Sequence, residues 1–284
     1  APWEIFVSES QERMLLVVPD KNLQEVLQIF AGEDVEATPI GKFIQDKISK
    51  IYYKGTVVGE LDLQFLFNPI STTKKAVWQK PEYPEPTFDE PKDLTQVLLK
   101  LLSQPNIASK ESVVRTYDHE VKGNTVLKPL HGEFSGPNDA AVLKPLSTSW
   151  QGIVISSGMN PNYGKIDPYW MAASAIDEAI RNNIAAGGRR IALLDNFCWG
   201  NPEKPDRLGG LVRAAQSCYD MAKTFQTPFI SGKDSLYNES PLGPVTPSLL
   251  ITALGIIPDV KKAVSVDLKK PGNLIYIVGN TYPD

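Results

Sequence analysis

Residues 195–207 read DNFCWGNPEKPDR, and the segments on either side of this stretch decide the fold. The apolar run 191–194 precedes it, and a helical pattern over residues 208–224 follows it. Because a short apolar run before a loop is typical of a buried strand, the sequence predicts a strand, a loop and a helix in succession. Open α/β sheets tend to bind ligands at such connections. We therefore consider a binding loop here, with an ordinary surface loop as the alternative.

A second polar stretch, SGKDS at residues 231–235, also follows a short apolar run, at residues 228–230. We expect a turn at Ser231 and Gly232 that brings backbone N–H groups close to a ligand. Lys233 could pair with a phosphate as a point charge, and Ser235 offers a hydroxyl. This second polar stretch favours a binding role for the first one.

Acidic and amide side chains recur at the ends of predicted strands and helices. They are Asp139, Glu178, Asn182 and Asp195. Oxygen-only ligands suit Mg²⁺, which keeps several waters and usually bridges to phosphates. A nucleotide held with Mg²⁺ but without a P-loop is therefore one hypothesis. The alternative is that Glu178 and Asn182, four residues apart, share a solvated helix face.

Composition excludes several classes of protein. The chain has 284 residues, of which 42% are hydrophobic, so it has enough apolar side chains for a core. A net charge of −4 argues against a general nucleic-acid binder. Cys198 and Cys218 give neither a disulfide framework nor a metal-binding spacing, so a reduced, cytoplasmic location is expected. No apolar run is long enough for a membrane span.

The remaining chain predicts alternating elements around a proline-rich linker. The linker covers residues 69–92 and is expected to be extended, with Trp78 and Tyr83 pinning it to a surface. Asp118, His119 and Glu120 suggest a metal or catalytic group, but a structural hydrogen bond is favoured because no second histidine stands at helical spacing. Helices are predicted at 21–30, 93–104 (capped by Asp93), 106–117 and 167–186, and strands at 14–18, 48–53, 56–63, 125–128, 140–143, 152–156, 247–257 and 273–278.

Several longer segments resemble one enzyme family, phosphoribosylformylglycinamidine synthase, in order and spacing. These segments are SESQERMLLVV at 8–18, QPNIASKES at 104–112, YDHEVKGNT at 117–125, NDAAVL at 138–143, GNPEKPD at 200–206 and SGKDSLYNE at 231–239. The resemblance covers nearly the whole chain. It implies an ATP-dependent ligase of purine biosynthesis, which makes an amidine from formylglycinamide ribonucleotide, ATP and glutamine-derived ammonia.

The resemblance also implies a fold class and a domain order. The fold would be α/β (α+β): a sheet-and-helix domain like that of aminoimidazole ribonucleotide synthetase, flanked by partial α+β domains. Residues 1–68 would end a first C-terminal domain, 69–92 would be a linker, 93–260 a second N-terminal domain, and 261–284 the start of a second C-terminal domain. The chain starts without Met and stops just after a strand-like run, so we expect an internal piece of a longer protein.

Individual residues of this chain match site residues of the family. Glu9, Ser10 and Gln11 match a substrate-binding segment, and Ser235 matches a substrate contact. Asp195 and Gly232 match the ATP site, together with the neighbouring Lys233. Lys233 stands where shorter bacterial members have an asparagine that helps to hold Mg²⁺, and a protonated lysine cannot be such a ligand. Asp139, Glu178 and Asn182 match metal ligands of an auxiliary nucleotide site in the large single-chain members.

The resemblance places the catalytic histidine and the main Mg²⁺ ligands upstream of this chain. Neither His119 nor His131 matches that histidine, so we expect these residues alone to be inactive. Three alternatives stay open: the ligase half itself, a non-catalytic scaffold half with a structural ADP and Mg²⁺, and another synthetase of the superfamily. A glutaminase subunit or domain is the expected partner, no nucleic acid or membrane partner is expected, and an exposed sheet face would favour a homo-oligomer.

Overall fold

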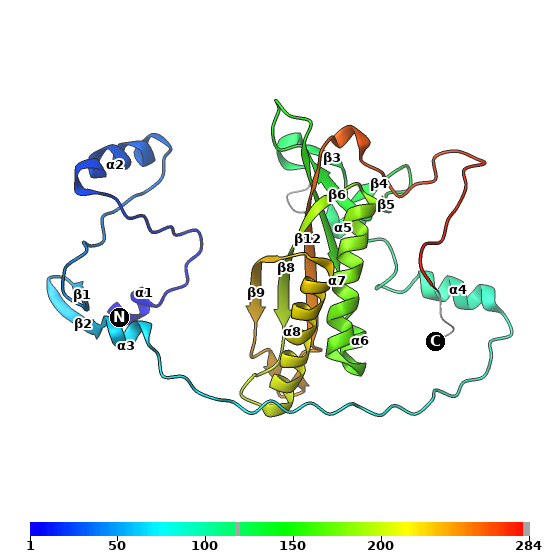
Figure 1. The fold of residues 1–284 in the computed structure, drawn as a ribbon, viewed down its shortest axis with the longest axis horizontal. Helices are drawn as coiled ribbons and strands as arrows, with labels where there is room; N and C mark the ends of the chain where they lie inside the picture. The colour runs from blue at the N-terminus through cyan, green and yellow to red at the C-terminus, as the bar shows by residue number, and fades with distance from the viewer. Residues whose placement is uncertain (117–119, 281–284) are drawn as a thin grey trace. The chain divides into compact units, whose positions relative to one another are not determined.

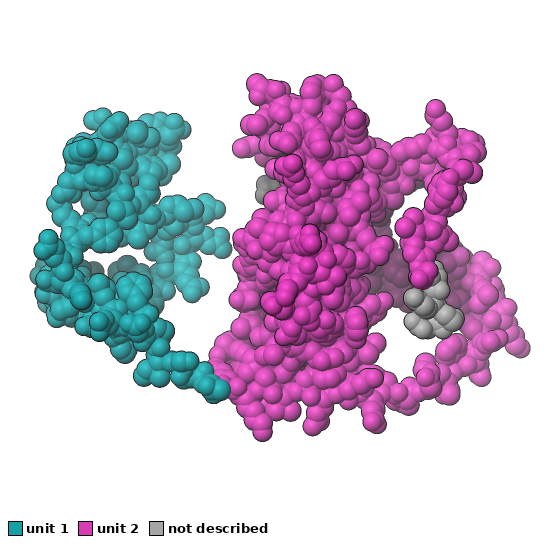
Figure 2. Space-filling view, in the orientation of Figure 1, with its two compact units in different colours: residues 1–73 teal, residues 74–284 magenta. Residues whose placement is uncertain are grey.

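The computed structural model describes residues 1–116 and 120–280, in two compact units formed by residues 1–73 and 74–284 (Figure 2). The division falls inside the predicted linker, and residues 69–92 contain no helix or strand. The suspected group at Asp118 and His119 lies outside the described residues.

The first unit contains three short helices and one hairpin. The predicted hairpin is confirmed, because β1 (Ile48–Tyr53) pairs antiparallel with β2 (Thr56–Asp62). Lys54 and Gly55 join the strands with φ of 49° and 80°, the left-handed conformation that a two-residue hairpin turn needs. The predicted helix at 21–30 is also confirmed, since α2 spans Leu23–Gly32; α1 (Pro2–Phe6) and α3 (Leu63–Phe67) complete the unit.

The predicted strand at residues 14–18 is wrong. These residues form neither helix nor strand, and Met14 is 84% exposed. An extended segment becomes a strand only when a neighbouring strand accepts its backbone hydrogen bonds, and no strand of the described unit lies beside this one. Apolar composition alone therefore gave a false prediction here.

The second unit is built on a six-stranded mixed sheet of order β3-β6-β7-β12-β8-β9 (Figure 1). All neighbours are antiparallel except β8 and β9, which are parallel. The strands are β3 (Thr125–Leu127), β6 (Ala140–Leu143), β7 (Gly152–Gly158), β8 (Arg189–Cys198), β9 (Phe229–Ser235) and β12 (Ser248–Ile257).

Two long helices, α7 (Pro168–Ala185) and α8 (Pro205–Phe225), cover one face of this sheet (Figure 1). Asp167 caps α7 by accepting a hydrogen bond from the Tyr169 N–H at 2.9 Å, and Gly187 follows its end with φ of 103°. The α7 face that packs on the sheet is buried at Ala172, Ala175, Ile176, Ala179 and Ile180, whereas Ile184 is 58% exposed. Burial alternates along β12, so its even- and odd-numbered side chains face opposite sides of the sheet.

Shorter elements complete the second unit. Asp93 caps α4 (Leu94–Leu102) as predicted, with its side chain accepting from the Thr95 N–H at 2.9 Å. The predicted helix at 106–117 shrinks to one turn, α5 (Glu111–Val114). The others are α6 (Pro161–Ile166), η2 (Val121–Gly123), η3 (Val260–Lys262), and the two-residue strand pairs β4 (Leu130–His131) with β5 (Gly136–Pro137) and β10 (Glu239–Ser240) with β11 (Gly243–Pro244).

The predicted strand at residues 273–278 is wrong for the same reason as that at 14–18. Leu274 is 76% exposed and Val278 86% exposed, and no strand of the described residues pairs with this segment. Among the described residues, no helix is long and apolar enough to cross a membrane.

The linker is pinned to the second unit by Trp78 and Tyr83, as the sequence predicts. The Arg213 guanidinium lies 4.0 Å from the centre of the Trp78 ring, and the Tyr83 hydroxyl donates to the Lys165 carbonyl at 2.9 Å. The Val77 N–H also donates to the Pro205 carbonyl at 2.8 Å. These contacts hold the linker against the start of α8.

Candidate functional site at the carboxyl end of the sheet

The stretch DNFCWGNPEKPDR contains less loop than its polarity suggests. Strand β8 continues through Asp195 and Asn196 to Cys198, because β12 and β9 supply hydrogen-bonding partners on both sides. Helix α8 begins at Pro205, three residues before the predicted start, where the fixed φ of proline suits the first helical position. The connecting loop is therefore confined to residues 199–204.

The turn predicted at Ser231 and Gly232 is wrong, because residues 231–235 belong to β9. Asp195 stands opposite Gly232, and Asn196 stands opposite Lys233. Polar side chains misled the prediction here, since an edge strand can carry polar residues on its exposed surface. Backbone N–H groups of this segment take part in a strand pair rather than in a loop around a ligand.

The register divides the predicted nucleotide-binding residues between the two sides of the sheet. Asp195 and Gly232 share the side that faces α8, since a Cβ added to Gly232 would lie 2.8 Å from the Asp195 Cγ. Lys233 and Ser235 point to the other side of the sheet, because side chains alternate along a strand. There the Lys233 ammonium contacts the Ser235 hydroxyl. Lys233 and Ser235 can therefore act together on one anion, whereas Asp195 points away from them.

Asp195 is an unusual carboxylate in this site. Burial, and secondly the charge of Asp234, raise the pKa of Asp195. The same buried environment, with a contribution from Asp195, raises the pKa of the Cys218 thiol on α8 to about 12. A desolvated acid beside a second acid at the end of a strand is typical of functional sites, although structural clusters show it too.

The GNPEKPD loop is held by the segment that follows β9. The Trp199 N–H donates to the Ser235 carbonyl at 2.8 Å, and the buried Trp199 indole donates to the Arg207 carbonyl at 2.9 Å. Glu239 accepts from the Asn201 N–H at 3.0 Å and also contacts the Lys204 ammonium. These contacts fix the loop between β8 and α8 as one rigid piece.

The glutamates of this region are engaged in structural contacts. Hydrogen bonding by Lys204, followed by the Asn201 N–H, lowers the pKa of Glu239. Hydrogen bonding by Lys74, followed by Tyr237, lowers the pKa of Glu203. Lys74 belongs to the linker, so an ion pair ties the linker to this loop.

A second polar group lies at the ends of β7 and α7. The Glu178 carboxylate accepts from the Met159 N–H and from the Asn160 amide, both at 3.0 Å. The Asn182 amide donates to the Ser157 carbonyl at 3.1 Å. Asp139 is exposed and directly precedes Ala140, which pairs with Ser156. Asp139 and Asn182 therefore both lie close to the last residues of β7.

The two polar groups occupy the same end of the sheet. Gly158 pairs with Ile251, and Ile251 pairs with Asp195 on its other side. Only β12 separates β7 from β8, so the strand ends that carry the two polar groups are about 10 Å apart at ordinary strand spacing. The structure thus places all the predicted site residues of the second unit along one edge.

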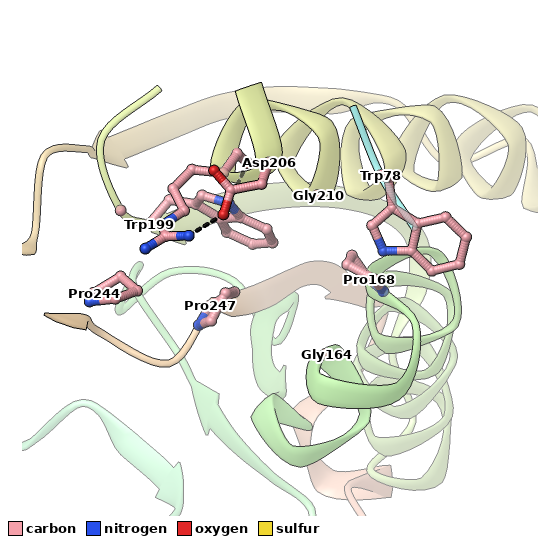
Figure 3. Close-up of a pocket in the computed structure, with 10 residues that line it drawn as sticks. Trp78, Gly164, Pro168, Trp199, Asp206, Gly210, Pro244 and Pro247 are labelled. Atoms are coloured by element: carbon pink, nitrogen blue, oxygen red, sulfur yellow. Dashed lines mark hydrogen bonds and ion pairs between the residues drawn. The ribbon is translucent and has the colours of Figure 1, made fainter. Parts of the chain in front are cut away.

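A small cavity of about 160 Å³ adjoins the GNPEKPD loop. The rings of Trp78, Trp199 and three prolines line it (Figure 3), and Asp206 and Arg207 also contribute to its lining. Ligand pockets usually measure about 300–1,000 Å³, so this space is too small for a nucleotide. None of the predicted nucleotide-binding residues lines this cavity, so the sheet edge that carries them is taken as the candidate site.

The predicted substrate segment belongs to the first unit. Glu9, Ser10 and Gln11 are exposed, and a turn follows at Gln11 and Glu12. The Ser10 hydroxyl lies 2.9 Å from the Ser8 hydroxyl, and the Arg13 side chain donates to the Ser10 carbonyl at 3.1 Å. The side chains of Glu9 and Gln11 are thus accessible to a ligand.

Two residues that organise the site were not predicted. Glu239 joins three donors of the loop, yet its only sequence signal was its place at the end of the SGKDSLYNE segment. Trp199 is 1% exposed, although it follows a polar stretch that suggested a surface loop. For the metal hypothesis, the described residues contain no group of three or more His, Cys, Asp or Glu side chains suited to an ion.

Two family models match the chain. The model "AIR synthase related protein, N-terminal domain" matches residues 137–257, and "AIR synthase related protein, C-terminal domain" matches residues 1–54. The first match contains the sheet edge described above, and the second contains the predicted substrate segment. The chain is therefore built from AIR synthase related domains.

Within that class, the chain is similar to the phosphoribosylformylglycinamidine synthases. It is 40% identical, over 99% of its length, to the phosphoribosylformylglycinamidine synthase subunit PurL of Methanocaldococcus jannaschii. The chain spans only 38% of that relative's length. The similarity seen in the sequence motifs is thus confirmed over nearly the whole chain.

Solved PurL structures from Thermotoga maritima have the same fold. TM-scores are 0.70 for the PurLQS structure, 0.65 for PurL complexed with ATP and 0.67 for PurL complexed with FGAR. Identities are 22–23%, and each alignment covers 93% of this chain and about 40% of the other. The expected fold class is therefore confirmed.

Proposed function

We propose that this chain forms part of an ATP-dependent carbon–nitrogen ligase of purine biosynthesis. The reaction converts formylglycinamide ribonucleotide, ATP and glutamine-derived ammonia to formylglycinamidine ribonucleotide. Similarity to PurL over 99% of the chain supports this proposal. PurL structures complexed with ATP and with FGAR give further support through their shared fold.

The observation that carries the proposal is the sheet edge where two polar groups converge. Asp195 and Gly232 lie opposite each other on parallel strands, and Glu178 and Asn182 bond to the end of β7. Carboxyl ends of β7 and β8 meet at this edge because both strands run antiparallel to β12. Such an edge is where α/β proteins bind nucleotides.

The proposed roles follow from charge and position. Lys233 and Ser235 would hold a phosphate, since an ammonium and a hydroxyl of one sheet face reach the same anion. Gly232 would allow close approach of the nucleotide to the backbone. Asp195 would orient the nucleotide from the opposite side of the strand. Glu9, Ser10 and Gln11 would bind the ribonucleotide substrate from the first unit.

The residues of the second polar group fit Mg²⁺. Asp139, Glu178 and Asn182 offer only oxygen ligands, and Glu178 uses one oxygen for both of its hydrogen bonds, which leaves its second oxygen available. When bound, the ion would neutralise polyphosphate charge. Lys233 does not fit a ligand role while it is protonated, so in this proposal these three residues would hold the ion.

In the proposed reaction, ATP activates the formamide oxygen and ammonia then displaces phosphate. This chain would supply orientation, because fixing the substrate phosphate far from the reacting amide uses binding energy to align the reactants. The GNPEKPD loop is suited to that task, since Glu239 and Trp199 prevent it from moving independently of the sheet. A rigid site stabilises developing charge without reorganising.

A structural nucleotide site is the second candidate. Glu178 and Asn182 already bond to neighbouring groups, which gives them a role in holding α7 against β7. In that case the site would keep ADP through dialysis, whereas a catalytic site would release nucleotide in step with product. Retention of radiolabelled ADP during turnover of the complete enzyme distinguishes the two.

The sheet face opposite α7 and α8 suggests association with another domain or copy. Its side chains include Ile153, Ile155, Leu250, Leu254 and Ile256, which alternate with the buried set. Apolar surface of this kind favours self-association, and sedimentation at rising concentration would detect it. We further propose that a glutaminase subunit or domain delivers ammonia to the complete enzyme.

Isothermal titration of the chain with ADP, with and without Mg²⁺, tests the nucleotide site. We expect binding that depends on Mg²⁺ and is lost in Asp139→Ala. Asp177→Ala is the matched control, because Asp177 lies on α7 but pairs with Arg181 at 2.6 Å. Binding that persists in Asp139→Ala, or that ignores Mg²⁺, would contradict the assignment.

A further inference from the structure

The end of the sheet opposite the proposed nucleotide edge carries a concentration of positive charge. Five basic residues and one tryptophan lie at the strand ends there, and we name them the basic rim. They are Lys144, Trp150, Arg189, Arg190, Lys261 and Lys262. None of them has a part in the proposed reaction.

Hydrogen bonds and strand pairing bring these residues together. The Val260 N–H donates to the Trp150 carbonyl at 2.9 Å, which places η3 beside the start of β7. Arg189 pairs with Ile256 near the end of β12, and Lys144 directly follows β6. Strands β6, β7, β12 and β8 are consecutive in the sheet, so the rim crosses four neighbouring strands.

The positive charges of the rim are not neutralised within the described residues. No ion pair there includes Lys144, Arg189, Arg190, Lys261 or Lys262. The neighbouring carboxylate of Asp259 accepts from the Lys261 backbone N–H at 3.0 Å. Lys144 is held by the Leu146 and Ser147 carbonyls, at 2.7 and 2.8 Å, rather than by an acid.

Trp150 organises the lysines of the rim. Its side chain is 54% exposed, with the Lys261 ammonium 3.7 Å and the Lys144 ammonium 5.3 Å from the ring centre. Cation–π attraction therefore holds both ammonium groups in place. The two lysine side chains then lose less conformational entropy when an anion binds to them. Two ammonium groups near the ring compete with the stacking of a nucleic-acid base on it.

A β-bulge positions the arginine pair. The register between β8 and β12 shifts between Leu254 and Ile256, and Arg190 has φ of 51°. A non-glycine residue in this left-handed conformation is disfavoured, and bulges commonly redirect side chains. Arg189 and Arg190 are both exposed, so neither is held in the core.

We propose that the basic rim binds an extended acidic segment of a partner protein. Four strands span about 15 Å, which matches about five residues of extended chain. Nucleic acid fits less well, because the chain carries a net charge of −4 and two ammonium groups lie near the ring of its exposed tryptophan. This inference does not depend on the proposed ligase function.

Fluorescence anisotropy with a labelled hexaglutamate peptide tests the rim, using the full chain. We expect saturable binding that weakens as salt rises, and at least tenfold weaker binding by Lys261→Glu/Lys262→Glu. Lys100→Glu/Lys165→Glu is the matched control, because both lysines are exposed in the second unit but lie on α4 and α6. The affinity of this control should stay within twofold of that of another double variant with the same net charge, whose substitutions lie outside both lysine pairs.

Further arms exclude general electrostatics and misfolding. Lys144→Gln/Arg190→Gln should weaken peptide binding without charge reversal, and circular dichroism melting should show that each variant is folded. A 12-base-pair DNA duplex under the same conditions should bind at least tenfold more weakly than the peptide. Failure of hexaglutamate to bind, equal loss in the control double variant, or tighter binding of the duplex would each overturn the proposal.

Discussion

Gly232 lies against the Asp195 carboxylate, and Gly232→Ala tests how tightly β8 and β9 are matched at the candidate site. An added Cβ would lie 2.8 Å from the Asp195 Cγ, whereas ordinary contacts begin at 3.4 Å. Asp195 is half-buried, so the rotation that relieves this contact has to move a partly desolvated carboxylate. Overpacking of this kind costs about 1–3 kcal/mol. In a unit of about 200 residues, that lowers Tm by roughly 3–10 °C.

Urea denaturation and calorimetry of Gly232→Ala, Asp195→Ala and the double variant provide the assay. Since Asp195→Ala removes the obstructing carboxylate, the double variant should lose at least about 1 kcal/mol less than the two single losses together. Gly136→Ala is the control, because its added Cβ would meet nothing nearer than the His131 carbonyl at 3.8 Å. Wild-type melting of Gly232→Ala, or additive losses, would refute this account of the contact.

Three further predictions concern charge, reactivity and the linker. Burial, and secondly the charge of Asp234, raise the pKa of Asp195 above its ordinary value of 3.8. The folded chain therefore binds the Asp195 proton more tightly than the unfolded chain, and it loses stability as pH rises from the ordinary pKa through the raised pKa. Asp195→Asn should therefore gain stability relative to wild type between pH 4 and pH 7 in urea denaturation, and a constant difference would contradict this. Because the pKa of the Cys218 thiol is raised to about 12, Cys218 should react with iodoacetamide at pH 8 only after the chain is denatured. Mass spectrometry of the Cys198→Ser variant, in which Cys218 is the one remaining cysteine of the sequence, can show this. Rapid labelling of the native chain would contradict it. Trp78→Ala removes the stack on Arg213, worth about 1 kcal/mol, and should speed proteolysis within residues 74–92, whereas Trp3→Ala should leave that rate unchanged.

The fold was predictable where a segment's periodicity agreed with its surroundings. Helix α7 followed from its alanine-rich stripe and from the glycine at position 187 beyond its end, whereas the cap at Asp167 is visible only in the structure. The strand at 247–257 followed from its length and apolar composition. Residues 14–18 and 273–278 have similar composition but no partner strand among the described residues. Strand formation depends on that partner, which local sequence does not reveal.

The sequence suggested candidate site residues but did not show how they are arranged. Polarity at residues 195–196 and 231–235 suggested loops, whereas parallel pairing of β8 with β9 makes both segments strands. Alternation then places Asp195 and Lys233 on opposite faces, a consequence of register rather than of composition. Glu239 is more than thirty residues from the loop that it holds, so only the folded chain shows their contact.

The linker contacts give a physical reason for the shape of the GNPEKPD loop. Glu203 pairs with Lys74, and the Val77 N–H donates to the Pro205 carbonyl. The second half of the loop is therefore tied to the linker at Glu203 and again at Pro205. A Cβ on Gly209 would clash with the Val77 carbonyl, which explains a glycine in the first turns of α8. The other side of the loop is tied to Glu239 and, through Trp199, to the end of β9. Any movement of the linker must therefore act on the loop between β8 and α8. Such coupling would let the linker influence a ligand bound at this edge of the sheet without touching it.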